Sequence, residues 1–252
     1  MYGKILIILL ALLLLFCPVP NPYPNRLETY ALSSTKPYTI AHFVYGLWDS
    51  GEMPEKFAKT MKLWEKQGWK VKLWDGKMVD ALLDKYPRYK EIVPSFERKV
   101  QKADLARLLI LYDEGGHYFD LDCIPTERNL YDYLNKHNPP AIFYVEHTLC
   151  LAQYFMSMFR TIRNFKPETL IRIANYSFGA FPKNETVLNN LELLRERCLK
   201  FPDYKGDYDV LFKTGPDCTT HAVMNSEERA ILPHNPWMKH VRAGSWRNSK
   251  DL

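Results

Sequence analysis

The chain has 252 residues, of which 46% are hydrophobic and 14% aromatic, and its formal net charge is +5. This composition supplies a full apolar core and excludes a disordered chain, and the length suits one large domain or two small ones. Basic and acidic residues are interspersed, which indicates a mixed solvated surface and no nucleic-acid partner.

The N-terminal segment differs from the rest of the chain. Lys4 precedes an apolar run from Ile5 to Cys17, and a series of prolines follows. The run is shorter than a usual membrane span of about 20 residues and lacks a small-residue cleavage site. We therefore favour an uncleaved signal anchor over residues 1–19, with a cleaved signal as the alternative. The prolines predict a stiff stem over residues 20–36.

Cysteines and glycosylation sequons bear on the compartment. Four cysteines lie beyond the anchor, in spacings that fit no zinc pattern, so the sequence allows either two disulfides or buried thiols. Sequons begin at Asn175 and Asn184, and they have meaning only in a eukaryotic secretory setting.

The first predicted elements alternate between strand and helix. β-branched and aromatic residues predict a strand within residues 38–48, and Pro54 opens a predicted helix that runs to Trp64. Strict alternation predicts a second strand over residues 69–74. A short helix is predicted over residues 78–86, where the following proline ends it.

The clearest helix is predicted over residues 97–112, with one apolar face, and the glycines at 115–116 end it. A strand over 117–124 and an apolar strand over 141–145 follow, and 187–199 has the pattern of an amphipathic helix.

Residues 150–175 give no clear pattern, and the chain from Gly206 onward is predicted to be loop-rich. The repeated succession of strand, helix and strand predicts an α/β domain with a single, mainly parallel sheet flanked by helices.

Carboxylates and one guanidinium gather around the glycine pair. Asp104 and Arg107 lie three residues apart on the predicted helix, and therefore about one turn apart on one face. On the predicted strand, Tyr118, Asp120 and Asp122 share a face. Two carboxylates beside a core strand need a positive partner, which Mg²⁺ or Mn²⁺ would supply. Each pair also has a simpler interpretation when taken alone. Asp104 and Arg107 are compatible with a surface ion pair, and Asp120 and Asp122 with a strand end in solvent.

This arrangement resembles the sugar-binding region of glycosyltransferase family 32, which includes α-mannosyltransferases and α-1,4-galactosyltransferases. Ala103 stands where the family usually has Ser. The resemblance is specific over about residues 100–125 and weaker elsewhere.

The resemblance implies a GT-A fold with a Rossmann-like sheet over residues 37–252. It implies a metal-dependent, retaining enzyme that moves a hexose from a UDP- or GDP-hexose to a glycan or glycolipid acceptor. With the anchor, it implies a single-pass type II membrane protein of the Golgi or another secretory compartment, if the source is eukaryotic.

The resemblance also assigns roles to the central residues. Asp122 would bind Mn²⁺ or Mg²⁺, and Asp120 would support the metal and hold ribose or sugar hydroxyls. Arg107 would reach the diphosphate or sugar oxygens, and Asp104 would accept sugar hydroxyls. Asp120, Asp122 and Arg107 are thus the candidate catalytic residues.

Weaker matches extend the predicted donor site. Tyr45 is the first candidate to stack on the donor base and Trp48 the second, although both are equally compatible with core aromatics. Asn175 stands where relatives have a sugar-contacting Asn, and a glycan on its sequon would exclude that role.

Two C-terminal segments complete the resemblance. Residues 213–216, Lys-Thr-Gly-Pro, resemble a turn found late in these enzymes. His240 is the third candidate metal ligand, and Ser245 and Trp246 are candidates to close over the donor.

Two other classes remain open. A metal phosphohydrolase of the haloacid-dehalogenase type also has Asp-x-Asp after a strand, but Ile124 stands where it normally has Thr or Val, and Asp104 and Arg107 have no role in it. A non-catalytic sugar-binding protein on the same fold is the other alternative.

Overall fold

The computed structural model describes residues 38–241, with gaps at 48–51, 149–170, 204–205 and 233–234. The predicted anchor and stem lie outside the described residues. Among the helices that are described, none has the length and apolar character to cross a membrane.

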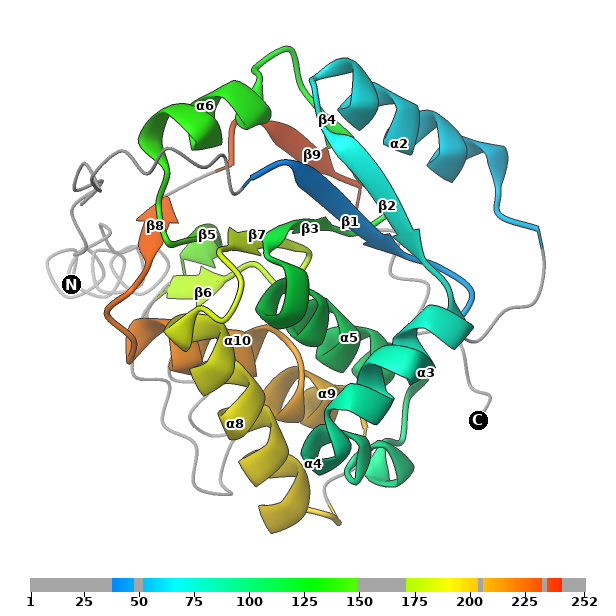
Figure 1. The fold of residues 1–252 in the computed structure, drawn as a ribbon. Coiled ribbons are helices and arrows are strands. Elements are labelled where there is room, and N and C mark those ends of the chain that lie inside the picture. Colours follow the sequence, from blue (N-terminus) through cyan, green and yellow to red (C-terminus); the bar gives the residue numbers. More distant parts are fainter. Residues whose placement is uncertain (1–37, 48–51, 149–170, 204–205, 233–234, 242–252) are drawn as a thin grey trace, which may run out of the picture.

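A seven-stranded mixed sheet forms the centre of the domain (Figure 1), with the strand order β2-β1-β3-β7-β5-β6 and with β8 paired to β5. The strands are β1 Ile40–Val44, β2 Lys70–Trp74, β3 Gly116–Phe119, β5 Ala141–Thr148, β6 Ile171–Ile173, β7 Ser177–Ala180 and β8 Ala230–Leu232.

The prediction of a mainly parallel sheet is wrong. β1 pairs in parallel with β2 and β3, and β5 with β8, but β7 runs antiparallel to both β3 and β5, and β6 is antiparallel to β5. β6 and β7 both run antiparallel to β5, with Ile173 opposite Val145 and Ala180 opposite Ala141, so residues 171–180 return along β5 as two consecutive strands. The three residues Ala174, Asn175 and Tyr176 keep the two strands in one direction, and a return along the neighbouring strand has no need of the crossover helix that parallel strands require.

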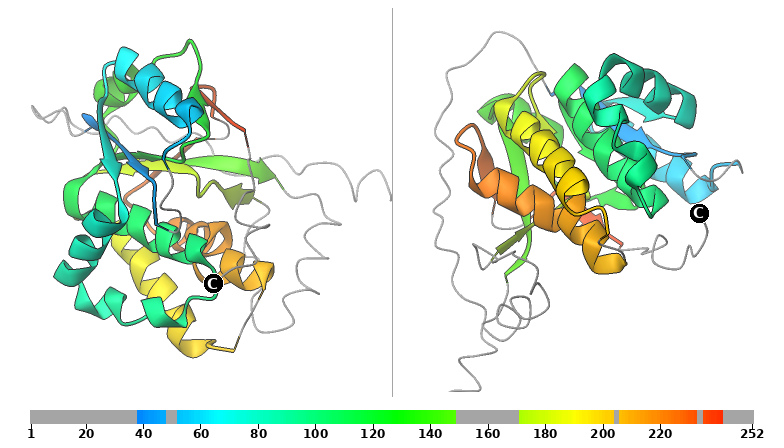
Figure 2. Two further views of the ribbon diagram at one scale, coloured as in Figure 1. Left: turned by 90° about the vertical axis from the view of Figure 1, so that its right-hand side faces the viewer. Right: turned by 90° about the horizontal axis from the view of Figure 1, so that it is seen from below.

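Helices cover both faces of the sheet (Figures 1 and 2). One face carries α3 Gly76–Lys85, α4 Pro87–Lys90, the 3₁₀ turn Val93–Ser95, α5 Lys99–Glu114, α8 Glu185–Lys200, α9 Asp207–Lys213 and α10 Pro216–Met224. The other carries α2 Glu55–Lys66, α6 Leu130–His137 and a small antiparallel sheet of β4 Cys123–Pro125 and β9 Met238–His240.

Two apolar cores, one on each face, follow from the alternation of side chains along the strands. In β3, Tyr118 belongs to the core beneath α5, whereas Phe119 belongs to the core beneath α2. Phe119 stacks on Trp64 of α2 with 3.9 Å between ring centroids. The indole N–H of Trp64 in turn donates to the carbonyl of Cys123 at 2.9 Å, which ties α2 to β4.

Most of the predicted elements in the first half of the domain are present. The predicted strands within 38–48 and over 69–74 are β1 and β2, and the predicted helices over 54–64 and 97–112 are α2 and α5. The predicted single apolar face of α5 is wrong, because the helix packs between the sheet, α3 and α8 and is buried all round from Ala103 to Leu111.

The prediction of a loop-rich C-terminal part is also wrong, since it contains α9, α10, β8 and β9. The sequence of α10, with adjacent threonines and a cysteine, has low helix propensity. Pro216 at the first helical position and burial of Cys218 and Val223 against the core stabilise the helix instead.

Three of the cysteines beyond the anchor, Cys123, Cys198 and Cys218, are buried and free. The buried-thiol interpretation therefore holds for them, and two disulfides among the four are excluded. Cys150 lies outside the described residues.

Candidate functional site

Asp120 and Asp122 lie in a tight turn between β3 and β4, so their predicted placement on one continuous strand is wrong. The N–H of Cys123 donates to the carbonyl of Asp120 at 2.9 Å and closes the turn. The N–H of Asp120 donates to the carbonyl of Tyr176 at 2.8 Å. This bond continues the register of β3 and β7 by one residue, and after the turn β4 pairs with β9 instead.

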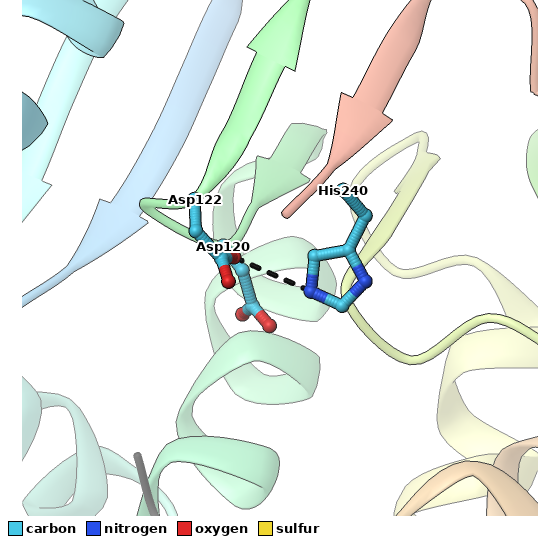
Figure 3. Close-up of side chains that lie close together, drawn as sticks. All are labelled: Asp120, Asp122 and His240. Carbon is cyan, nitrogen blue, oxygen red and sulfur yellow. Dashed lines mark ion pairs between the residues drawn. The ribbon is translucent and has the colours of Figure 1, made fainter. Parts of the chain in front are cut away.

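The pairing of β4 with β9 brings His240 to the same turn. Cys123 lies opposite His240 in the register of the two strands, and the N–H of Val241 donates to the carbonyl of Asp122 at 3.2 Å. His240 Nε2 is 3.3 Å from Asp122 Oδ1 (Figure 3). The imidazole stacks on the ring of Tyr176, with centroids 4.0 Å apart.

One ligand atom each of Asp120, Asp122 and His240 lies within 4.8 Å of the others, and the three side chains converge in Figure 3. All three are partly exposed, so the group is open on one side. Burial raises the pKa of Asp120, Arg107 lowers it, and Asp122 raises it further. Two carboxylates and one imidazole are a donor set that fits Mn²⁺ and, less well, Mg²⁺, which accepts nitrogen reluctantly.

Arg107 connects this group to the interior. Its guanidinium is 5% exposed, with Nη2 at 3.0 Å from Asp104 Oδ1 and Nη1 at 3.4 Å from Asp120 Oδ1. Nη1 also donates to the carbonyl of Asn175, and the guanidinium lies over the ring of Tyr118. Burial lowers the pKa of Arg107, but the nearby Asp120, Tyr118 and Asp104 raise it by more. The net result is a pKa above the usual value. A surface ion pair is therefore excluded for Arg107 and Asp104.

Asp104 is 3% exposed and receives donors from three other residues. Its Oδ1 faces Arg107 and accepts from Asn175 Nδ2 at 2.9 Å, and its Oδ2 accepts from Thr214 Oγ1 at 2.7 Å. Burial raises the pKa of Asp104 to about 6, against the lowering effects of Arg107 and Thr214. The converging donors favour the carboxylate, which is the ionised form above that value.

Asn175 lies inside this network, between Asp104 and α10. Its side-chain oxygen accepts from Thr219 Oγ1 at 3.0 Å, while its nitrogen donates to Asp104, and the residue is 8% exposed. A glycan on this nitrogen has no room in the folded domain. The second sequon is equally buried, because Asn184 caps α8 by accepting from the N–H of Val187 at 3.2 Å.

Sequence reasoning did not assign Thr214 or Thr219 to the site. The Thr-Gly-Pro turn at residues 214–216 is a signal for the first, since it places Thr214 just before the first turn of α10. Thr219 has no sequence signal of its own.

Of the remaining predicted donor residues, Tyr45 is among those that the structure describes. Tyr45 follows the end of β1, where its hydroxyl donates to the carbonyl of Glu52 at 3.3 Å and its ring is tilted against Phe57. Trp48, Ser245 and Trp246 lie outside the described residues.

Residues 54–140 match the family described as "Glycosyltransferase sugar-binding region containing DXD motif". The resemblance predicted from Asp104 to Asp122 is thereby confirmed. This segment holds Asp104, Arg107, Asp120 and Asp122, whereas Asn175, the two threonines and His240 lie beyond it.

Individual relatives match the chain over similar lengths. Inositol phosphoceramide mannosyltransferase 1 of Schizosaccharomyces pombe is 33% identical over 89 residues, which are 33% of this chain and 28% of that protein. An uncharacterized glycosyltransferase of Acanthamoeba polyphaga mimivirus is 31% identical over 101 residues, 38% of this chain and 40% of that one. The matches thus span less than half the length of these relatives.

Among solved structures, the chain is similar to one titled "PaToxG Glycosyltransferase". The likeness has a TM-score of 0.47 at 16% identity and covers 74% of this chain and 68% of that one.

Proposed function

We propose that the protein is a metal-dependent, retaining glycosyltransferase of GT-A type that transfers a hexose from a UDP- or GDP-hexose to a glycan or glycolipid acceptor. Attachment to a membrane through residues 1–19, in the Golgi or another secretory compartment, is part of this proposal. The family match at residues 54–140 supports it, as does the local charge balance around Arg107.

The charge balance is the observation that carries the proposal. Asp104 and Asp120 pair with the guanidinium of Arg107, and Asp122 lies beside Asp120 and pairs with His240. Carboxylates that gather in a partly buried site are costly unless cations join them. A divalent cation at the open side balances the site, and it leaves a positive centre beside Arg107 to which a diphosphate can bind.

Asp120, Asp122 and His240 are the residues that would hold this cation, for which we propose Mn²⁺, with Mg²⁺ as the alternative. The cation supplies Lewis-acid stabilisation of the negative charge on the leaving diphosphate. Arg107 adds charge-assisted hydrogen bonds to phosphate or sugar oxygens, and its fixed geometry means that little reorganisation is needed.

Asp104 and Asn175 would contact the hexose hydroxyls, and they hold the guanidinium of Arg107 from the other side. Tyr45 remains our proposal for stacking on the donor base. Trp48, Ser245 and Trp246 complete the proposed donor site.

Retention at the anomeric carbon needs either a nucleophile or attack on the face of the leaving group. Cys123, a thiol beside the site, is fully buried, and burial raises its pKa well above the usual value, which disfavours it as a nucleophile. We therefore favour same-face transfer. The acceptor oxygen bonds to the anomeric carbon, the bond from that carbon to the phosphate oxygen breaks, and the phosphate oxygen takes the acceptor's proton.

The test is turnover of a panel of UDP- and GDP-hexoses with Mn²⁺, with Mg²⁺ and with a chelator. We expect metal-dependent release of the nucleotide, and loss of about 100-fold or more in Asp122→Asn. Asp132→Asn, an exposed position on α6, is the matched control and keeps full activity. Full metal-dependent activity in Asp122→Asn would sink the assignment.

The panel also separates the alternatives. Hydrolysis of simple phosphate esters without any sugar-nucleotide turnover would identify a phosphohydrolase. Metal-dependent binding of a sugar nucleotide with neither activity would identify a binding protein on the same fold.

A further inference from the structure

Two threonines on either side of the start of α10 contact the side chains of Asp104, which pairs with Arg107, and Asn175, whose main-chain carbonyl accepts from Arg107. Thr214 Oγ1 donates to Asp104 Oδ2 at 2.7 Å, and Thr219 Oγ1 donates to Asn175 Oδ1 at 3.0 Å. Both threonines are fully buried. Each hydroxyl therefore has a defined partner and no access to water.

The hydrogen bonds have a direction. Asn190 of α8 donates from Nδ2 to Thr219 Oγ1 at 3.2 Å, so the single proton of that hydroxyl is left for the oxygen of Asn175. With its oxygen engaged, the amide of Asn175 directs its nitrogen to Asp104 Oδ1 at 2.9 Å. A chain of donors thus runs from α8 through α10 and ends on the Asp104 carboxylate.

Thr220, the neighbour of Thr219, shows what a helix threonine does by default. Its hydroxyl donates to the carbonyl of Pro216, four residues earlier in α10, at 2.6 Å. The hydroxyl of Thr219 instead donates to the side-chain oxygen of Asn175. Thr214 has a local acceptor too, the carbonyl of Val210 at 3.2 Å, but Asp104 lies closer.

We propose that Thr214 and Thr219 are positioning residues of the donor site, which orient Asp104 and Asn175 and, through them, the guanidinium of Arg107. Neither hydroxyl has a hydrogen bond to Asp120, Asp122 or His240, and the connection to these proposed metal ligands is the longer contact of Arg107 Nη1 with Asp120 Oδ1, at 3.4 Å. The expected effect on catalysis rests on the proposed function. The orientation of Asp104, Asn175 and Arg107 can be measured without turnover.

The catalytic test compares Thr214→Val and Thr219→Val with Thr214→Ser and Thr219→Ser. Valine keeps the volume and removes the hydroxyl, and serine restores it. We expect kcat to fall about 10- to 100-fold in the valine variants, with the Mn²⁺ dissociation constant unchanged, because remote misplacement and loss of supporting contacts have effects of this size. The serine variants regain kcat to within about threefold of wild type.

Thr220→Val is the matched control, on the same helix with a hydroxyl directed to backbone groups. A loss of kcat in Thr220→Val as large as in Thr219→Val, at equal loss of thermal stability, would show a merely structural role. Unchanged kcat in both valine variants would overturn the inference as well.

A second measurement does not depend on activity. In the metal-free protein, the side-chain amide of Asn175 and the guanidinium N–H groups of Arg107 are followed by ¹⁵N NMR. We expect their resonances to shift and their hydrogen exchange to quicken in Thr214→Val or Thr219→Val and to stay in place in Thr220→Val. Unaltered resonances in the folded valine variants refute the inference. Absence of sugar-nucleotide turnover in the wild type, with these shifts present, refutes the proposed function alone.

Discussion

His42 of β1 makes the stability of the domain sensitive to acid. Its Nε2 lies 2.9 Å from the carbonyl of Gly115 and must carry the proton, and its Nδ1 accepts from the indole N–H of Trp74 at 3.0 Å. Both nitrogens are thus engaged in the neutral form, and a second proton would face the N–H of Trp74. Burial lowers the pKa of His42 from 6.5 to about 4, with a smaller lowering by Lys72.

The sign follows from proton uptake. The unfolded chain binds this proton at higher pH than the folded domain, so the contribution of His42 is complete above pH 6.5 and is lost as the pH falls toward about 4. Between about pH 7.5 and about pH 4.5 the loss is about 2.5 kcal/mol of the free energy of unfolding. That is a large part of the 5–15 kcal/mol, roughly, that holds an ordinary domain folded.

Other buried groups titrate in the same window, so the test uses differences between variants. Burial lowers the pKa of His117 to about 3, so this residue also lowers the free energy of unfolding as the pH falls. The raised pKa of Asp104 increases the free energy of unfolding over the same change in pH. Urea unfolding of wild type and His42→Gln is compared at about pH 7.5 and about pH 4.5. The variant is less stable at the higher pH, and its deficit shrinks by about 2.5 kcal/mol at the lower.

Trp74→Phe gives an independent check, because it removes the donor that opposes protonation of Nδ1 and keeps the imidazole. It should lower stability at neutral pH and weaken the acid dependence. A deficit of His42→Gln that is the same at both pH values would refute the reasoning.

Two further variants test the ion pairs of Arg107 and the backbone conformation at Gly116. Arg107→Lys puts one ammonium in place of the guanidinium that reaches Asp104, Asp120 and the Asn175 carbonyl. We expect the free energy of unfolding in urea to fall by about 3 kcal/mol and the rate of nucleotide release to fall about 100-fold. Arg195→Lys, in a surface pair with Glu91, is the control and should change neither quantity. Gly116→Ala puts a Cβ at a φ of +89°, 2.7 Å from the Ile40 carbonyl, and should cost about 2–4 kcal/mol in urea unfolding. Gly206→Ala has a similar φ of +101° and open space around the Cβ, so it should cost only about 1 kcal/mol, and equal losses at both glycines would contradict the clash.

Local pattern was enough to predict α2, β2 and α5, because their periodicity and stop signals are contained in the segments themselves. Gly115 adopts a φ of +71° directly after α5, as the predicted helix end requires. The turn that carries Asp120 could not be predicted this way. It depends on the carbonyl of Tyr176 and on the pairing of Cys123 with His240, which are partners far away in the sequence.

The direction of the strands had the same limit. The sequence of β7, Ser-Phe-Gly-Ala, is compatible with a strand in either orientation, and its antiparallel place between β3 and β5 follows from the return of residues 171–180 along β5. The burial of Asp104 likewise came from packing. A helix that looks amphipathic in sequence becomes an interior helix because Asp120, Asn175 and Thr214 cover its polar residues Asp104 and Arg107.

The site therefore has two walls of different origin. Asp104, Arg107 and the turn that carries Asp120 and Asp122 come from the segment that matches the family, and they lie close together in the sequence. Asn175 and His240 come from later segments, which reach the first wall through β7 and β9. Asn175 contacts Arg107 through its main-chain carbonyl, and His240 lies beside Asp122, so under the proposed function we expect substitutions in this second wall, beyond the family match, to change which donor sugar is used.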